Sequence, residues 1–316
     1  MAQVRIEAFI KDIQENLYRG AEFLKHSVSH DQYVDDYKVH VPQAGSGAAV
    51  QKNRAQLPAT VVERLDDSKD YTLDEYTTDP IVIRNIETIQ LSYDKRMSVM
   101  KDFINLINQQ IGDDGAYNWG ADVPSLANGG IYLTTGTQTA LSAAFCPGLF
   151  LSGATGSRRL FQLTDILQLQ NKLNRDNVPQ EGRHLLIPTD MWNDLMSTNS
   201  TILGSKLYQP DEQLIVDGSL AKIFGFNIWQ RPTVNTFSGS NTPVIKAVGS
   251  AGAATDSLGC IAWQEDVVAK AQGAVKFFAN TDRAEYFGSL YSALVMFHNT
   301  LLRSDAKGVA MLVQAT

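Results

Sequence analysis

Cysteine is scarce in this sequence: Cys146 and Cys260 are the only two among 316 residues. Two cysteines without a CxxC spacing make no disulfide framework, so we expect both to be buried free thiols. Long apolar runs are lacking as well, since no stretch approaches the roughly 18 uncharged apolar residues of a membrane span. The start, Met-Ala-Gln-Val-Arg-Ile-Glu, has no apolar signal core. The sequence therefore predicts neither secretion nor contact with a membrane.

Charge is also in short supply. Charged residues make up 19% of the chain, and the formal net charge is −7. A protein that grips nucleic acid through its phosphates is normally basic, so this chain is not built to hold DNA tightly. A surface short of charge is typical of a protein that is buried against neighbours.

Catalytic motifs are missing too, because GxxxxGK[ST], GxGxxG, HExxH and GxSxG do not occur. His26 and His30 lie four residues apart and could bind a metal. No third ligand has a recognisable spacing, so we favour a solvated pair at the end of a helix. The acidic pairs 66–67 and 113–114 fall in turn-rich segments, where aspartate usually bonds to the backbone. We therefore expect no catalytic residue, metal or cofactor.

Two features resemble phosphate sites. Arg158-Arg159 could clamp a phosphate, although a basic pair is more often a solvated or interface feature. Ser152-Gly-Ala-Thr-Gly-Ser is rich in glycine but lacks the lysine and the strand–helix frame of a phosphate-binding loop. Neither predicts an enzyme.

Helical periodicity is strong in two segments. Residues 4–25 have one apolar face, and we expect this helical arm to dock through Phe9, Ile13 and Leu17. Residues 86–111 repeat apolar side chains every three or four positions, and the four residues 112–115, which include two glycines, are expected to end that helix. We predict that it is a spine packed on the C-terminal strands through Tyr93, Met97, Met100, Ile104 and Ile107.

An extended hairpin is predicted at 37–65, before the long helix. Its two arms are expected at 37–47 and 57–65, with Gly45-Ser-Gly47 and Lys52-Asn-Arg54 near its middle. An isolated hairpin is marginally stable in water, so this one needs a surface, which another copy of the chain could supply. The residues expected to make that contact are Pro42, Gly45, Gly47, Lys52 and Arg54.

The remaining pattern mixes helices and strands, which indicates an α+β fold. Helices are expected at 164–173, where Thr164 can cap the N-terminus, at 188–196 and at 265–271. Strands are expected at 79–83, 184–187, 226–229, 260–263, 275–279, 290–302 and 309–313.

The order of these elements resembles that of tailed-bacteriophage major capsid proteins with the Hong Kong 97-like fold. Several runs are similar to phage coat sequences, among them Val41-Pro-Gln-Ala-Gly, Asp79-Pro-Ile-Val-Ile, Gly182-Arg-His-Leu-Leu-Ile-Pro and Ile223-Phe-Gly-Phe-Asn-Ile. The resemblance implies an N-terminal arm at 1–36 and an extended loop at 37–72. It implies a peripheral domain made of 73–160 and 273–316, and an axial domain at 161–272.

By this resemblance, the chain would self-assemble as hexamers and pentamers into an icosahedral shell enclosing double-stranded DNA. Its expected partners are further copies of itself, portal, scaffolding and decoration proteins, and DNA bound without sequence specificity. Its expected location is the virion capsid, with assembly in the host cytoplasm. Some family members crosslink a loop lysine, and Lys52 lies near that place, but its partners are not identifiable here. The alternatives are an encapsulin-type compartment and, less favoured, a soluble hydrolase.

Overall fold

The computed structural model describes residues 21–43, 52–54, 61, 63, 67–85, 95–140, 153–198, 222–239, 242–303 and 305–316. Helices and several sheets combine into an α+β fold, as predicted. Outside the described residues lie Phe9, Ile13, Leu17, Gly45, Gly47, Tyr93 and Cys146. Cys260 is buried and free, as expected. Among the described helices, none is long and apolar enough to cross a bilayer.

The first sheet is dominated by one long antiparallel hairpin. It is formed by β16 (Val268–Arg283) and β17 (Gly288–Leu301). Three short strands complete this sheet: β1 (Val28–Ser29), β5 (Asp74–Thr77) and β6 (Ile81–Arg84). Along β17, buried residues alternate with half-buried ones, as expected of a strand with one face on a core. The predicted helix at 265–271 is wrong, because only the 3-10 turn η5 (Glu265–Val267) precedes β16.

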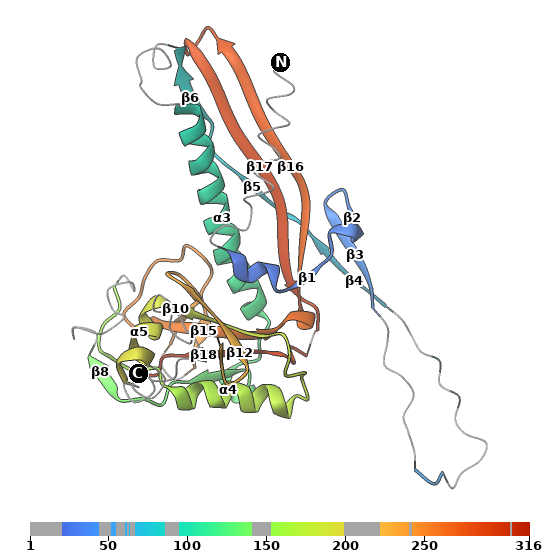
Figure 1. Cartoon of the computed structure of the whole chain (residues 1–316), viewed down its shortest axis with the longest axis vertical. Helices are drawn as coiled ribbons and strands as arrows, with labels where there is room; N and C mark the ends of the chain where they lie inside the picture. The colour runs from blue at the N-terminus through green and yellow to red at the C-terminus, as the bar shows by residue number, and fades with distance from the viewer. Residues whose placement is uncertain are drawn as a thin grey trace, which may run out of the picture.

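Helix α3 (Lys95–Ala121) lies along this hairpin (Figure 1). It does not end at Gly112, so the predicted C-terminus of the spine is wrong. The glycines mark close contacts instead: a Cβ on Gly112 would lie 2.7 Å from Arg231 Nη2, and one on Gly115 would lie 2.8 Å from Leu24 Cδ2. The helix ends at Ala121, three residues before Pro124, which cannot continue a helix.

The second sheet has eight strands. They are β7 (Ile131–Leu133), β10 (Arg183–Pro188), β11 (Lys222–Ile223), β12 (Phe226–Arg231), β13 (Thr236–Ser238), β14 (Val244–Ile245), β15 (Ser257–Gln264) and β18 (Val309–Val313). At its centre, β15 pairs with β10 on one side and β18 on the other. Helices α4 (Leu163–Arg175) and α5 (Thr189–Thr198) pack against this sheet through a second apolar cluster. The cap of α4 is Gln162 with Asp165, not the predicted Thr164.

The hydrogen-bond network crosses the predicted domain boundaries. β7 comes from the segment 73–160 and β18 from 273–316, yet both belong to the eight-stranded sheet. The boundaries themselves stay predictions. Two smaller features, the η3 turn (Leu126–Asn128) and the pair β8 (Gln138–Ala140) and β9 (Ser157–Arg159), lie between α3 and α4 in the sequence.

A three-stranded ribbon forms the base of the extended loop. It consists of β2 (Val34–Asp35), β3 (Lys38–Gln43) and β4 (Asp67–Thr72). β3 lies within the first predicted arm, 37–47. The second was expected at 57–65, but β3 pairs with 67–72, so Pro42 lies opposite Ser68. Because β4 is polar, it carries no alternation that could have located it.

Candidate functional site

The extended loop presents exposed side chains on both arms. Pro42, Lys52 and Arg54 are exposed, and Asn53 between the two basic residues has a left-handed backbone with φ of 52°. Val61 is 95% exposed, which is unusual for a β-branched apolar residue. The described residues between β3 and β4 thus include two basic side chains and one apolar one, together with the exposed acidic Glu63.

An acidic groove lies between α3 and strands β5 and β6. Its volume is about 580 Å³. Apolar side chains on its wall include Tyr76, Phe103 and Leu106, and Leu106 is 61% exposed although it sits within a helix. Acidic residues also line the groove: Glu75, Asp79 and Asp114. A ligand with apolar groups flanked by positive charge would match this surface.

The predicted spine residues lie where α3 meets the hairpin. Met100, Ile104 and Ile107 are 4%, 8% and 4% exposed and belong to the main apolar cluster. That cluster also contains Phe297 and Leu301 of β17, the strand partners suggested by the sequence. Met97 lies within α3, but its side chain is not among those described.

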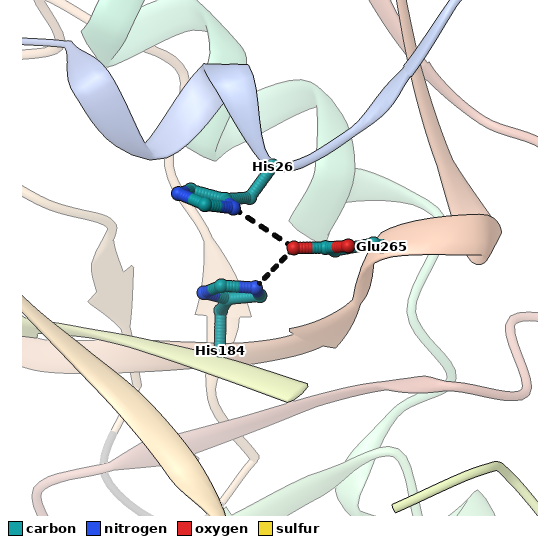
Figure 2. A group of neighbouring side chains, drawn as sticks. All are labelled: His26, His184 and Glu265. Atoms are coloured by element: carbon teal, nitrogen blue, oxygen red, sulfur yellow. Dashed lines mark hydrogen bonds and ion pairs between the residues drawn. The ribbon is translucent and has the colours of Figure 1, made fainter. Parts of the chain in front are cut away.

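A cluster of two histidines and a glutamate connects three distant parts of the chain (Figure 2). His26 follows the 3-10 helix η1 (Glu22–Lys25), His184 lies on β10, and Glu265 begins η5. Glu265 Oε1 is 2.8 Å from His26 Nδ1 and 2.7 Å from His184 Nε2. The two imidazole rings are stacked, with centroids 4.3 Å apart. Two histidines and a carboxylate are a known ligand set for zinc, so the cluster is a candidate metal centre.

The hydrogen bond behind His184 argues against a metal. Trp229 donates its indole N–H to His184 Nδ1 over 3.0 Å, so Nδ1 must carry a lone pair. The proton of the neutral ring is then on Nε2, where it is donated to Glu265. A histidine that binds a metal through Nε2 instead donates its Nδ1–H to an acceptor. The chemistry of this donor set fits a hydrogen-bonded network.

Local electrostatics agree with that network. Burial lowers the pKa of His184, an effect that outweighs the hydrogen bond to Glu265. Partial burial alone would raise the pKa of Glu265, but the hydrogen bonds from His26 and His184 hold it below its usual value. A neutral His184 beside an ionised Glu265 is therefore the stable arrangement near neutral pH.

The sequence interpretation of His26 and His30 is wrong. They are not a solvated pair on a helix: His26 binds Glu265, whereas His30 is 4% exposed and its Nδ1 lies 2.9 Å from the Tyr71 hydroxyl. The link from His184 to Glu265 was missed. It depends on β10 pairing with β15, which places His184 opposite Trp263 and close to Glu265, two residues farther along the chain.

Other candidates from the sequence have structural roles. Arg158 is 2% exposed and donates to the backbone carbonyls of Thr155, Ala254 and Asp256, so it is not presented to a phosphate. Asp113 lies inside α3 rather than in a turn, and it forms an ion pair with Arg231. Asp67 is likewise the first residue of β4.

Solved structures share this fold. The capsid of cyanophage P-SCSP1u matches 91% of this chain and 86% of its own, with a TM-score of 0.61 and 16% identity. The capsid of Ralstonia phage GP4 matches 92% and 87%, with a TM-score of 0.59 and 9% identity. A virus-like particle from Pyrococcus furiosus matches 98% and 99%, with a TM-score of 0.51 and 11% identity. No protein-family model and no curated protein matches the sequence. At these identities, the likeness establishes the fold.

Proposed function

We propose that this chain, which has the Hong Kong 97-like fold of phage capsid subunits, is the major capsid protein of a tailed bacteriophage. Copies of it would assemble as hexamers and pentamers into an icosahedral shell around double-stranded DNA. The observation that carries this proposal is the extent of the likeness to phage capsids, about nine-tenths of both chains.

The charge of the chain supports a container for DNA. A net charge of −7 means that a subunit neutralises few phosphates, so packaged DNA would not adhere strongly to the inner surface. Portal, scaffolding and decoration proteins would be further partners. The subunit would assemble in the host cytoplasm and remain in the virion capsid.

The extended loop is the natural intersubunit element. We propose that the loop of one copy lies in the groove beside α3 of another copy. Lys52 and Arg54 of the loop complement Glu75, Asp79 and Asp114 of the groove, and exposed Val61 matches its apolar wall. Pro42, Gly45 and Gly47 would shape the same contact. The arm residues Phe9, Ile13 and Leu17 would dock on the peripheral domain of the same or an adjacent subunit.

A second function is supported by one match. The virus-like particle from Pyrococcus furiosus corresponds to this chain over almost its whole length in both directions. An encapsulin-type compartment holding protein cargo would use the same fold. The neighbouring genes discriminate the two: portal and terminase genes favour a virion, and a cargo enzyme gene favours a compartment.

Electron microscopy tests the proposal directly. The chain is expressed, purified by size, and imaged in negative stain, with the content of any particles measured by absorbance at 260 and 280 nm. We expect rings or closed shells of many subunits. A chain that stays monomeric at high concentration, alone and with the scaffolding candidate from its own gene cluster, contradicts a capsid function. Turnover of a substrate by that monomer would favour the hydrolase alternative.

A further inference from the structure

The segment before the extended loop is seated firmly on the body of the protein. Ala21, Phe23 and Leu24 are at most 2% exposed. The Phe23 ring packs edge-on against Trp263, with centroids 6.0 Å apart. Next to these buried apolar residues, the Trp263 indole N–H donates to the backbone carbonyl of His26 over 2.9 Å. The His26–His184–Glu265 cluster is thus the polar end of the contact that fixes residues 21–29.

Each hydrogen bond in this cluster has a defined donor and acceptor. Trp229 donates to His184 Nδ1, His184 Nε2–H donates to Glu265 Oε1, and His26 Nδ1–H donates to the same oxygen. The chain of bonds requires His184 to be neutral and Glu265 to be ionised. His26 can keep its bond in either state, because the neutral Nδ1–H tautomer and the charged ring both carry a proton on Nδ1.

A second proton on His184 would break this arrangement. It could bind only at Nδ1, where the Trp229 N–H already points. Two donors would then face each other at a ring that is 1% exposed, and the new charge would stack on His26. A small side-chain movement would not give the new N–H an acceptor, so the network cannot accommodate the second proton. Protons can reach it from solvent, because the side chains of His26 and Glu265 are 35% and 40% exposed.

Other charges near the cluster are engaged elsewhere. Arg183 on β10 donates to the carbonyls of Val178 and Pro179, Arg231 on β12 pairs with Asp113, and Asp266 on η5 accepts from Gln264. Lys270 on β16 is buried beyond the cluster, where Asp31 and Lys25 act on it. Within the described part of the chain, the charged side chain that pairs with either imidazole is Glu265.

We propose that His26, His184, Glu265 and Trp229 form a proton-sensitive latch. At neutral pH the latch holds residues 21–29 against β10, β12 and η5. When His184 takes up a proton, the latch opens and residues 21–29 loosen. The proposal does not depend on the capsid function, because it concerns the docking of this segment within one chain.

The expected pH range follows from the direction of the histidine shift. Burial lowers the pKa of His184 in the closed state, whereas an opened, solvated histidine titrates near 6.5. The closed state is therefore fully favoured above pH 6.5. As the pH falls from 6.5 towards the lowered pKa of His184, the closed state becomes progressively less stable relative to the open state. One proton is taken up on opening, so the opening equilibrium should rise about tenfold per pH unit in that range.

Hydrogen exchange measured by mass spectrometry tests the latch on the full 316-residue chain. Exchange of peptides covering 21–29 is followed from pH 7.5 to 5.0 and corrected for the intrinsic pH dependence of amide exchange. We expect protection of these peptides to fall about tenfold per pH unit below 6.5. His184→Gln, whose amide can still donate to Glu265 but does not titrate, should keep its protection. His40→Gln is the matched control, because His40 pairs with Asp70 at an exposed site and should behave as wild type.

Three results would overturn the proposal: protection of 21–29 that does not change with pH, a His184→Gln profile identical to wild type, or one equivalent of Zn²⁺ bound in calorimetry and lost in His26→Gln. If His184→Gln does not fold, Glu265→Gln replaces it. That variant removes the ionised acceptor, so 21–29 should exchange faster than in wild type already at pH 7.5. Wild-type protection in Glu265→Gln at that pH would also contradict the latch.

Discussion

An ion pair between Arg231 of β12 and Asp113 of α3 links the eight-stranded sheet to the long helix. Arg231 Nη1 lies 2.9 Å from Asp113 Oδ1, and Nη2 donates to the Gln109 carbonyl over 2.8 Å. The side chains are 7% and 19% exposed. A charge pair with so little access to water needs both partners.

Replacing Arg231 by Met should therefore destabilise the subunit by about 3 kcal/mol, because it leaves a largely buried carboxylate without its cation. Urea denaturation gives the free energy of unfolding. The double variant Arg231→Met with Asp113→Leu should recover much of the loss. If the single and double variants are equally unstable, the lost packing of the arginine, not the stranded charge, is the cause.

Gly112→Ala should lower stability although alanine is the better helix former. In an open helix the change would gain about 1 kcal/mol. Here the new Cβ would lie 2.7 Å from Arg231 Nη2, which is held by its ion pair, so we expect a net loss of about 1–2 kcal/mol. The exposed Asp102→Ala in the same helix is the control and should be neutral or slightly stabilising. A stabilised Gly112→Ala would show that the guanidinium moves aside.

Ile104→Asp and Leu106→Asp should separate folding from assembly. Ile104 is 8% exposed in the core, so an aspartate there should cost several kcal/mol and give insoluble protein. Leu106 is 61% exposed in the groove, so its variant should fold normally. Circular dichroism checks folding, and sedimentation checks assembly, which we expect Leu106→Asp to impair. Normal particles from Leu106→Asp would exclude the groove as the docking site of the loop.

Asp194→Asn should stabilise the subunit in a pH-dependent way. Burial, reinforced by Asp190, raises the pKa of Asp194 to about 7. An aspartate with a raised folded pKa favours unfolding as the pH rises from its unfolded value towards that folded value, because the folded carboxyl resists ionisation. Asparagine removes this effect, so the variant's advantage in free energy of unfolding should grow by about 2–3 kcal/mol between pH 5 and 8. Exposed Glu181→Gln should show no such trend, and a constant difference for Asp194→Asn would disprove the assignment.

Deleting residues 44–56 should leave a folded subunit that cannot close a shell. The ribbon of β3 and β4 lies outside the deletion, and the deleted chain includes Lys52 and Arg54. Thermal melting should change little, while electron microscopy should show capsomers or aggregates in place of closed shells. Closed shells of normal size would mean that the loop is not needed between subunits.

Elements with a strong local hydrophobic signal were predictable. The strands β10, β15 and β18 are short apolar runs that are buried along their whole length, and β12 and the helix α5 also agree with the sequence pattern. The body of α3 was predicted as well, yet its end was not. Gly112 and Gly115 look like a helix stop in sequence, and only the proximity of Arg231 and Leu24 explains them as sites of close packing.

The features that the sequence did not predict depend on contacts between residues that are far apart in the chain. The polar strand β4 is specified by pairing with β3, and the His26–His184–Glu265 cluster exists because three distant segments converge. Hydrophobic periodicity is a local signal and carries no information about contacts between distant segments. A histidine on an apolar strand, as at His184, is the one hint that a buried partner is needed.

The place of β18 has a consequence for how the chain folds. β18 pairs with β15 close by in the sequence, but its other edge pairs in parallel with β7, so Met311 lies opposite Ile131 across most of the chain. Closing so large a loop is slow, whereas the β16–β17 hairpin is local and can form early. We therefore expect refolding to show a fast phase from the hairpin and a late, rate-limiting phase in which β7 and β18 meet. A late phase of this kind would keep newly made chains incompletely folded for a time.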